Sequence, residues 1–125
     1  MTMNSKVLIV DDEPNIVLAI DFLLKQKGFQ TEKAYNGKEA LEKVKSFQPD
    51  VVVLDVMMPE MNGIDTARQI RMTRGFSNVQ IVFLTAKGTT KDKMEGYSNG
   101  GDLYLTKPFD NTELVTAIEE ITIYG

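Results

Sequence analysis

The chain has 125 residues, of which 42% are hydrophobic and 26% are charged, a composition typical of a single globular domain. Its net charge is −4, which argues against a nucleic-acid-binding surface, since such surfaces need clustered Lys and Arg. The absence of Cys and His excludes disulfides, thiolate chemistry, imidazole zinc ligands and a Ser-His-Asp triad. No apolar run has the length of a signal-peptide core or a membrane span, so we expect a cytoplasmic protein without membrane contact.

Five short segments have the character of strands in a parallel sheet. In chain order they are Lys6–Val10, Gln30–Ala34, Asp50–Leu54, Val79–Leu84 and Asp102–Thr106. Three of them are rich in β-branched residues and apolar on both faces, as buried parallel strands are. The second is mostly polar, which indicates a strand at the edge of the sheet.

A helical pattern follows each of these strands. The helices are predicted to begin at Pro14 and end before Gly28, to run from Asn36-Gly37 to Phe47, to begin near Gly63 and include Ile70, and to cover Thr90–Ser98 and Asn111–Ile121. Such alternation predicts an α/β fold with a parallel sheet, helices on both of its faces and right-handed crossovers. We expect one domain over residues 1–125, with its core at about 6–121.

Chemically useful side chains stand where the predicted strands end. Ligands of open parallel sheets bind at this edge. The residues there are Asp11, Asp12 and Glu13 after the first strand, Asp55 after the third, Thr85 after the fourth and Lys107 after the fifth. Asp55 is expected to be the first residue to emerge from its strand, and it therefore need not be buried. Because neighbouring carboxylates repel each other, a divalent cation would relieve the conflict, and oxygen ligands suit Mg²⁺.

Each of these residues also has an ordinary structural explanation. Acids after a strand stabilise the start of the next helix, a threonine caps a turn, and a lysine most often lies in solvent. Their joint placement at the ends of different strands favours a functional site. The chain has neither GxGxxG nor GxxxxGK[ST], so a dinucleotide site or a P-loop has no support.

Four segments, VLIVDDE, VVVLDVMMPEMNG, VFLTA and YLTKPF, resemble in this order the receiver domain of bacterial two-component response regulators. The resemblance covers about Lys6 to Ile121. It implies the flavodoxin-like doubly wound (βα)5 fold with strand order 2-1-3-4-5.

The resemblance also implies roles for particular residues. Asp55 would accept a phosphoryl group as a carboxylate nucleophile. Asp12 would bind Mg²⁺ directly and Asp11 through water, with Asp55 and the backbone carbonyl of Met57 completing the protein ligands. Lys107 would pair with a phosphate oxygen.

A switch is implied as well. The hydroxyl of Thr85 would move towards the phosphate, and the ring of Tyr104 would turn into the space that it leaves. The Lys107-Pro108 peptide bond is expected to be cis, an expectation that comes from the family alone.

The resemblance also implies partners, and because the chain has no histidine the donor would be a different protein. The phosphodonor would be a histidine kinase or a histidine phosphotransfer protein. The output would be an effector protein or domain that binds the face formed by Thr90–Ser98, the fifth strand and the last helix. The chain would catalyse only its own phosphorylation and dephosphorylation and would not be an enzyme for a metabolite. Two alternatives stay open: a Mg²⁺-dependent phosphatase with Asp55 as nucleophile, and a pseudo-receiver that only binds partners.

Overall fold

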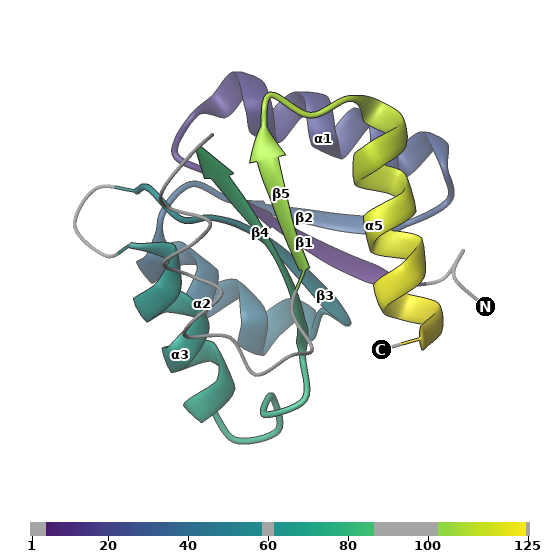
Figure 1. Ribbon diagram of the computed structural model, residues 1–125. Coiled ribbons are helices and arrows are strands. Elements are labelled where there is room, and N and C mark those ends of the chain that lie inside the picture. The colour runs from purple at the N-terminus through teal and green to yellow at the C-terminus, as the bar shows by residue number, and fades with distance from the viewer. Residues whose placement is uncertain (1–4, 59–61, 87–102, 125) are drawn as a thin grey trace.

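The computed structural model describes residues 5–58, 62–86 and 103–124 (Figure 1). Five parallel strands form one sheet in the order β2-β1-β3-β4-β5, which confirms the expected order. The strands are β1 (Lys6–Val10), β2 (Gln30–Ala34), β3 (Val51–Asp55), β4 (Gln80–Ala86) and β5 (Leu103–Lys107). The polar strand β2 lies at an edge, as its composition indicates, and the apolar β3 lies at the centre.

Four helices belong to the described part of the chain: α1 (Pro14–Gln26), α2 (Gly37–Phe47), α3 (Gly63–Met72) and α5 (Asn111–Tyr124). The helix predicted over Thr90–Ser98 lies outside the described residues. Pro14 occupies the first turn of α1, and Asn36 and Asn62 cap α2 and α3 by accepting backbone N–H groups. None of the helices among these residues has the length and apolar character needed to cross a membrane.

Helices cover both faces of the sheet. In Figure 1, α1 and α5 lie on one face and α2 and α3 on the other. Two hydrophobic clusters fill the two interfaces, and alternate residues of each inner strand contribute to them. In β3, for example, Val51 and Val53 pack towards α1 and α5, whereas Val52 and Leu54 pack towards α2 and α3. This alternation decides towards which face each residue at the strand ends projects.

Three strands continue beyond their predicted ends. Asp55, Thr85 and Lys107 were expected after their strands, but each lies within one. The expectation that Asp55 emerges from its strand and need not be buried is therefore wrong, since its exposed fraction is 4%. The cause is pairing: Asp55 is in register with Leu84, and the next N–H, that of Val56, donates to the Leu84 carbonyl at 3.0 Å.

Candidate functional site

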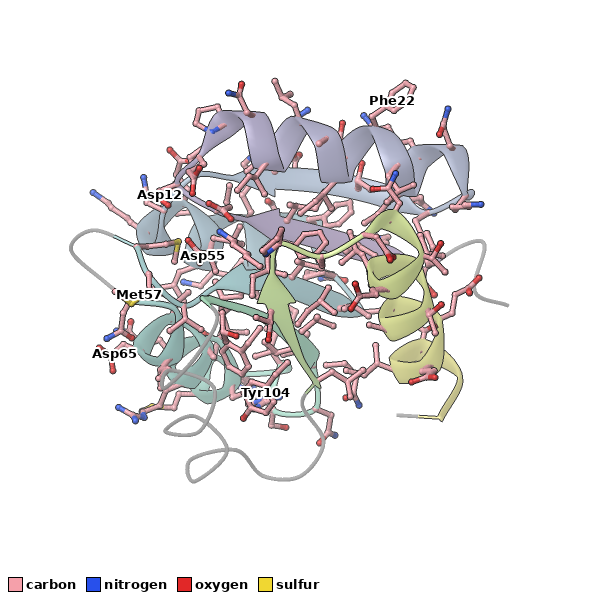
Figure 2. All side chains as sticks on the ribbon, turned by 45° about the horizontal axis from the view of Figure 1, so that its top comes forward. Asp12, Phe22, Asp55, Met57, Asp65 and Tyr104 are labelled. Atoms are coloured by element: carbon pink, nitrogen blue, oxygen red, sulfur yellow. The ribbon has the colours of Figure 1, made fainter. Side chains whose placement is uncertain are left out.

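Three carboxylates meet at the carboxyl ends of the central strands. Asp11, Asp12 and Asp55 each offer an oxygen that lies within 4.8 Å of the others. Figure 2 shows Asp12 and Asp55 close together at this edge. Asp11 and Asp55 are buried and Asp12 is half-buried. The sequence-based prediction that these acids gather at one place is what the geometry shows.

The alternation of the strands explains the meeting. Asp11 follows Val7 and Ile9 in one row of β1, and Asp55 follows Val51 and Val53 in the same row of β3. Because the register of β1 and β3 pairs Val10 with Leu54, the residues that follow, Asp11 and Asp55, lie side by side. Lys107 continues the corresponding row of β5 after Leu103 and Leu105. All three charged side chains thus project on the α1–α5 side.

Lys107 joins this cluster by ion pairs. Its Nζ lies 2.8 Å from Asp11 Oδ2 and 3.4 Å from Asp55 Oδ1, and Glu13 Oε1 follows at 3.9 Å. Sequence reasoning placed Lys107 at the site but missed its pairing with Asp11. The alternation of side chains along the strands could have indicated this pairing, because it places both residues on the same side of the sheet.

The charges remain unbalanced around Asp55. Its burial, and next the negative charge of Asp11, raise the pKa of Asp55 to about 6, although Lys107 and the backbone N–H of Met57 act in the opposite direction. Burial lowers the pKa of Lys107, but its hydrogen bond to Asp11 and the charges of Asp55 and Asp11 outweigh this, so its pKa is raised overall. The ammonium is therefore held in its charged form.

A magnesium ion fits this donor set. The three carboxylates supply only oxygen, which is the ligand type that Mg²⁺ prefers, and their excess negative charge is what a divalent cation would offset. Burial, and next the charge of Asp11, make the carboxylate of Asp55 costly to ionise alone, and a nearby cation would favour its ionised form.

Thr85 has a buried hydroxyl at the same edge of the sheet. Its side chain is fully buried, and its Oγ1 has no hydrogen-bond partner among the residues that the structure describes. A buried hydroxyl without a partner is costly, because it has lost its water without a replacement. Thr85 continues the row of Ile81 and Phe83, so it belongs to the α2–α3 side rather than to the side of Asp55.

Tyr104 lies on that same side, away from the acids. Its ring stacks on Phe83, with ring centroids 5.5 Å apart and an interplanar angle of 15°. Figure 2 shows it far from Asp55.

Two further expectations concern the loops. Met57 is next to the site: its backbone N–H donates to Asp55 Oδ1 at 3.4 Å, and its side chain points outwards and is exposed. The Lys107-Pro108 peptide bond is cis, as expected.

An apolar groove of about 480 Å³ lies between α1 and the start of α5, beside Lys107. It is lined mainly by apolar residues of α1, of α5 and of the loop between β5 and α5: Ile16, Ala19, Ile20, Leu23, Pro108, Phe109 and Leu114. Leu18 and Phe22 of α1 are exposed, and Figure 2 shows the ring of Phe22 pointing outwards from this helix. Sequence reasoning missed this groove, because it depends on how two distant segments pack.

Comparisons with known proteins agree with this arrangement. The family model described as "Response regulator receiver domain" matches residues 7–119. The DNA-binding response regulator MtrA of Mycolicibacterium smegmatis is 42% identical over 117 residues, which are 94% of this chain and 50% of that protein. The alkaline phosphatase synthesis transcriptional regulatory protein PhoP of Bacillus subtilis is 40% identical over 95% of this chain and 49% of its own length. The chain thus spans about half the length of these relatives.

A solved structure shares the fold over nearly the whole chain. The chemotaxis protein CheY4 of Vibrio cholerae superposes with a TM-score of 0.86 at 32% identity, covering 94% of this chain and 98% of that one. With the match to the family, the sheet order and the gathered acids, this likeness establishes that the chain belongs to the receiver domains of response regulators.

Proposed function

We propose that Asp55 accepts a phosphoryl group from a phosphohistidine donor, and that the chain acts as a phosphorylation-activated switch in a two-component phosphorelay. The observation that carries the proposal is the meeting of Asp11, Asp12, Asp55 and Lys107 at one edge of the sheet. A carboxylate oxygen of Asp55 attacks phosphorus, and the bond from phosphorus to the donor nitrogen breaks. The nitrogen keeps the electron pair, and an acyl phosphate forms on Asp55.

The remaining residues of the site position and neutralise charge. We propose that Asp12 binds Mg²⁺ directly and Asp11 through water, and that Asp55 and the backbone carbonyl of Met57 complete the protein ligands. Bound Mg²⁺ would supply positive charge to the oxygens of the transferring group. Lys107 already lies 3.4 Å from Asp55 Oδ1, which suits an ammonium that pairs with a phosphate oxygen.

Thr85 and Tyr104 form the proposed switch. A phosphate on Asp55 offers the buried Thr85 hydroxyl the hydrogen-bond partner that it lacks among the described residues. Movement of Thr85 would free space that the ring of Tyr104 enters, leaving its stack on Phe83. A near-complete switch needs roughly 5.5 kcal/mol. Because a hydrogen bond to a charged group contributes about 1.5–3 kcal/mol, two or three such contacts together with the metal would supply it.

The phosphodonor is a different protein, since this chain has no histidine. We propose a histidine kinase or a histidine phosphotransfer protein. The apolar groove beside Lys107 and the exposed Leu18 and Phe22 of α1 offer such a protein a surface near the acceptor.

The output is an effector protein or domain that binds the face of α5, β5 and residues 90–98. We place this switch in the cytoplasm. The net charge of −4 supports an output by protein contact rather than by nucleic-acid binding of this chain itself.

Incubation with acetyl phosphate and Mg²⁺, followed by intact-mass measurement, tests the proposal. We expect one added phosphoryl group, which is absent with EDTA and absent in Asp55→Asn. A chain that gains no mass under these conditions would be a pseudo-receiver. Sustained turnover of an added phosphomonoester would favour the phosphatase instead.

A further inference from the structure

The first residue of α3 is in close contact with the backbone of the proposed phosphoacceptor. Gly63 begins this helix, and its N–H donates to the carbonyl of Val56 at 2.9 Å. A Cβ atom at Gly63 would lie 2.2 Å from the carbonyl oxygen of Asp55 and 2.8 Å from the Cα of Val56. Both distances are well inside van der Waals contact, so even alanine does not fit without movement.

Neither neighbour can yield by a side-chain rotation, because the atoms that a methyl group would meet are backbone atoms. The end of β3 is held by β4, through the register of Asp55 with Leu84 and the hydrogen bond from Val56 N–H to the Leu84 carbonyl. The start of α3 is held by Ala67 and Ile70, which are buried in the cluster on that side of the sheet. A methyl group must therefore displace one of two anchored segments.

Displacement of either segment reaches the proposed ligands. Asp55 is itself the acceptor, and Met57 lies between Val56 and Gly63, whose hydrogen bond brings the two ends of this stretch together. The backbone N–H of Met57 also donates to the Asp55 carboxylate. Asp11 and Asp12 directly follow β1 and are not part of α3 or β3, so they would not move with α3.

We propose that Gly63 is a positioning residue for phosphoryl transfer: its lack of a side chain lets α3 start against the Asp55 backbone and sets where Asp55 and Met57 lie relative to Asp11 and Asp12. The inference rests on the proposed function of Asp55. It concerns the geometry of the acceptor rather than the contacts of the transferred group.

Gly75 provides a matched control. It follows α3, whereas Gly63 begins it, and a Cβ at Gly75 would meet nothing within 4 Å. Its φ of +93° disfavours any other residue, so Gly75→Ala strains the backbone far from the acids. The two alanine variants thus separate a general loss of stability from an effect on the site.

The test compares wild type, Gly63→Ala and Gly75→Ala in three measurements: thermal unfolding, Mg²⁺ affinity by NMR titration, and the rate of acyl-phosphate formation from acetyl phosphate. Since a misplacement of about 1 Å can cost on the order of a hundredfold in rate, we expect Gly63→Ala to react about ten- to a hundredfold more slowly and to bind Mg²⁺ more weakly. Gly75→Ala is expected to unfold at a lower temperature and to keep the wild-type rate and affinity.

A folded Gly63→Ala with the wild-type rate and Mg²⁺ affinity overturns the inference, whatever its melting temperature. If wild type itself takes up no phosphoryl group, the proposed function fails and the inference with it. If Gly63→Ala does not fold, hydrogen exchange of the backbone amides in the wild-type protein provides a second test. The Gly63 amide should be as protected as those of β3 and should shift with Met57 when Mg²⁺ is added. An unprotected Gly63 amide, or one that Mg²⁺ leaves unshifted, contradicts the inference.

Discussion

Asp55 lies in an environment that opposes its own ionisation. It is buried beside the carboxylate of Asp11, and the nearby ammonium of Lys107 offsets these two effects only in part. The pKa of Asp55 is therefore raised to about 6. At neutral pH the metal-free site holds an ionised carboxylate at a cost in stability, which binding of a cation would remove.

We predict that Asp55→Asn stabilises the metal-free protein at pH 7 by about 1–3 kcal/mol, because the amide removes the costly charge. A raised folded-state pKa carries no penalty below the unfolded value of about 4, and the penalty is complete above about pH 6. The advantage of the variant should thus grow between these pH values. Urea unfolding in EDTA at pH 4 and pH 7.5 measures it. A variant that is less stable than wild type at pH 7.5 would contradict the electrostatic explanation.

Glu13 adds one more negative charge beside the site, 3.9 Å from Lys107 and open to solvent. We predict that Glu13→Gln accelerates phosphorylation by acetyl phosphate, an anion, by about two- to fivefold at low ionic strength. The gain should shrink in high salt, where exposed charges are screened. Glu42→Gln, which changes an exposed acid of α2, is the control and should have no effect. A salt-independent gain would point to a different cause.

At the scale of single elements, α1 and β2 are joined by a buried polar contact. Asp21 of α1 is buried, accepts a hydrogen bond from Thr31 of β2, and forms ion pairs with Lys25 and Lys33. Burial acts to raise the pKa of Asp21, but the hydrogen bonds from Thr31 and Lys25 and the two positive charges lower it overall. The ionised form of Asp21 therefore stabilises the fold.

We predict that Asp21→Asn lowers the free energy of unfolding by about 1–2 kcal/mol at pH 7. A depressed folded-state pKa contributes stability above the unfolded value of about 4, and this contribution is lost as the pH falls through the folded value. The difference between wild type and variant should be constant from about pH 7 to 5 and smaller near pH 3. Chemical unfolding at the three pH values tests this, and a difference that persists unchanged at pH 3 would rule out the ionic contribution.

For single elements, the sequence predicted the strands but not where three of them end. Residue composition indicated the five strands and distinguished the buried ones from the polar edge strand, because β-branched apolar runs are most stable as buried strands. It did not reveal that β3, β4 and β5 include Asp55, Thr85 and Lys107, since a polar residue looks like the end of an apolar run. Only pairing with the neighbouring strand decides whether such a residue is still in the sheet.

At the scale of the whole molecule, the alternation of strands and helices predicted a parallel sheet, and the acids were expected to gather because parallel strands bring their carboxyl ends to one edge. The strand order was predicted from the resemblance to receiver domains. The sequence did not predict three features: the ion pair of Lys107 with Asp11, the groove between α1 and α5, and the contact of Gly63 with Asp55. Each depends on atomic distances between segments that are far apart in sequence, and residue types alone do not specify these distances.

Cation binding should stabilise the whole chain. We predict that Mg²⁺ at about one hundred times its Kd adds about 3 kcal/mol to the free energy of unfolding, because the ion binds the folded state. Asp12→Asn should lose most of this gain. Asp65→Asn, at a half-buried acid in the first turn of α3 that pairs with Arg68, should keep it. Thermal unfolding with and without Mg²⁺ distinguishes the variants, and equal gains in all three proteins would place the ion elsewhere.

The opposite projection of Asp55 and Thr85 has a consequence for how such a molecule can diversify. The proposed phosphoryl transfer takes place on the side of α1 and α5, whereas the residues proposed to sense it lie on the side of α2 and α3. Residues around Asp55 that set the rate of transfer and residues around Thr85 and Tyr104 that set the response can therefore change independently, because they adjoin different hydrophobic clusters. The two sides need to be coupled only at the carboxyl ends of β3 and β4, where Asp55 and Thr85 project to opposite faces of the sheet.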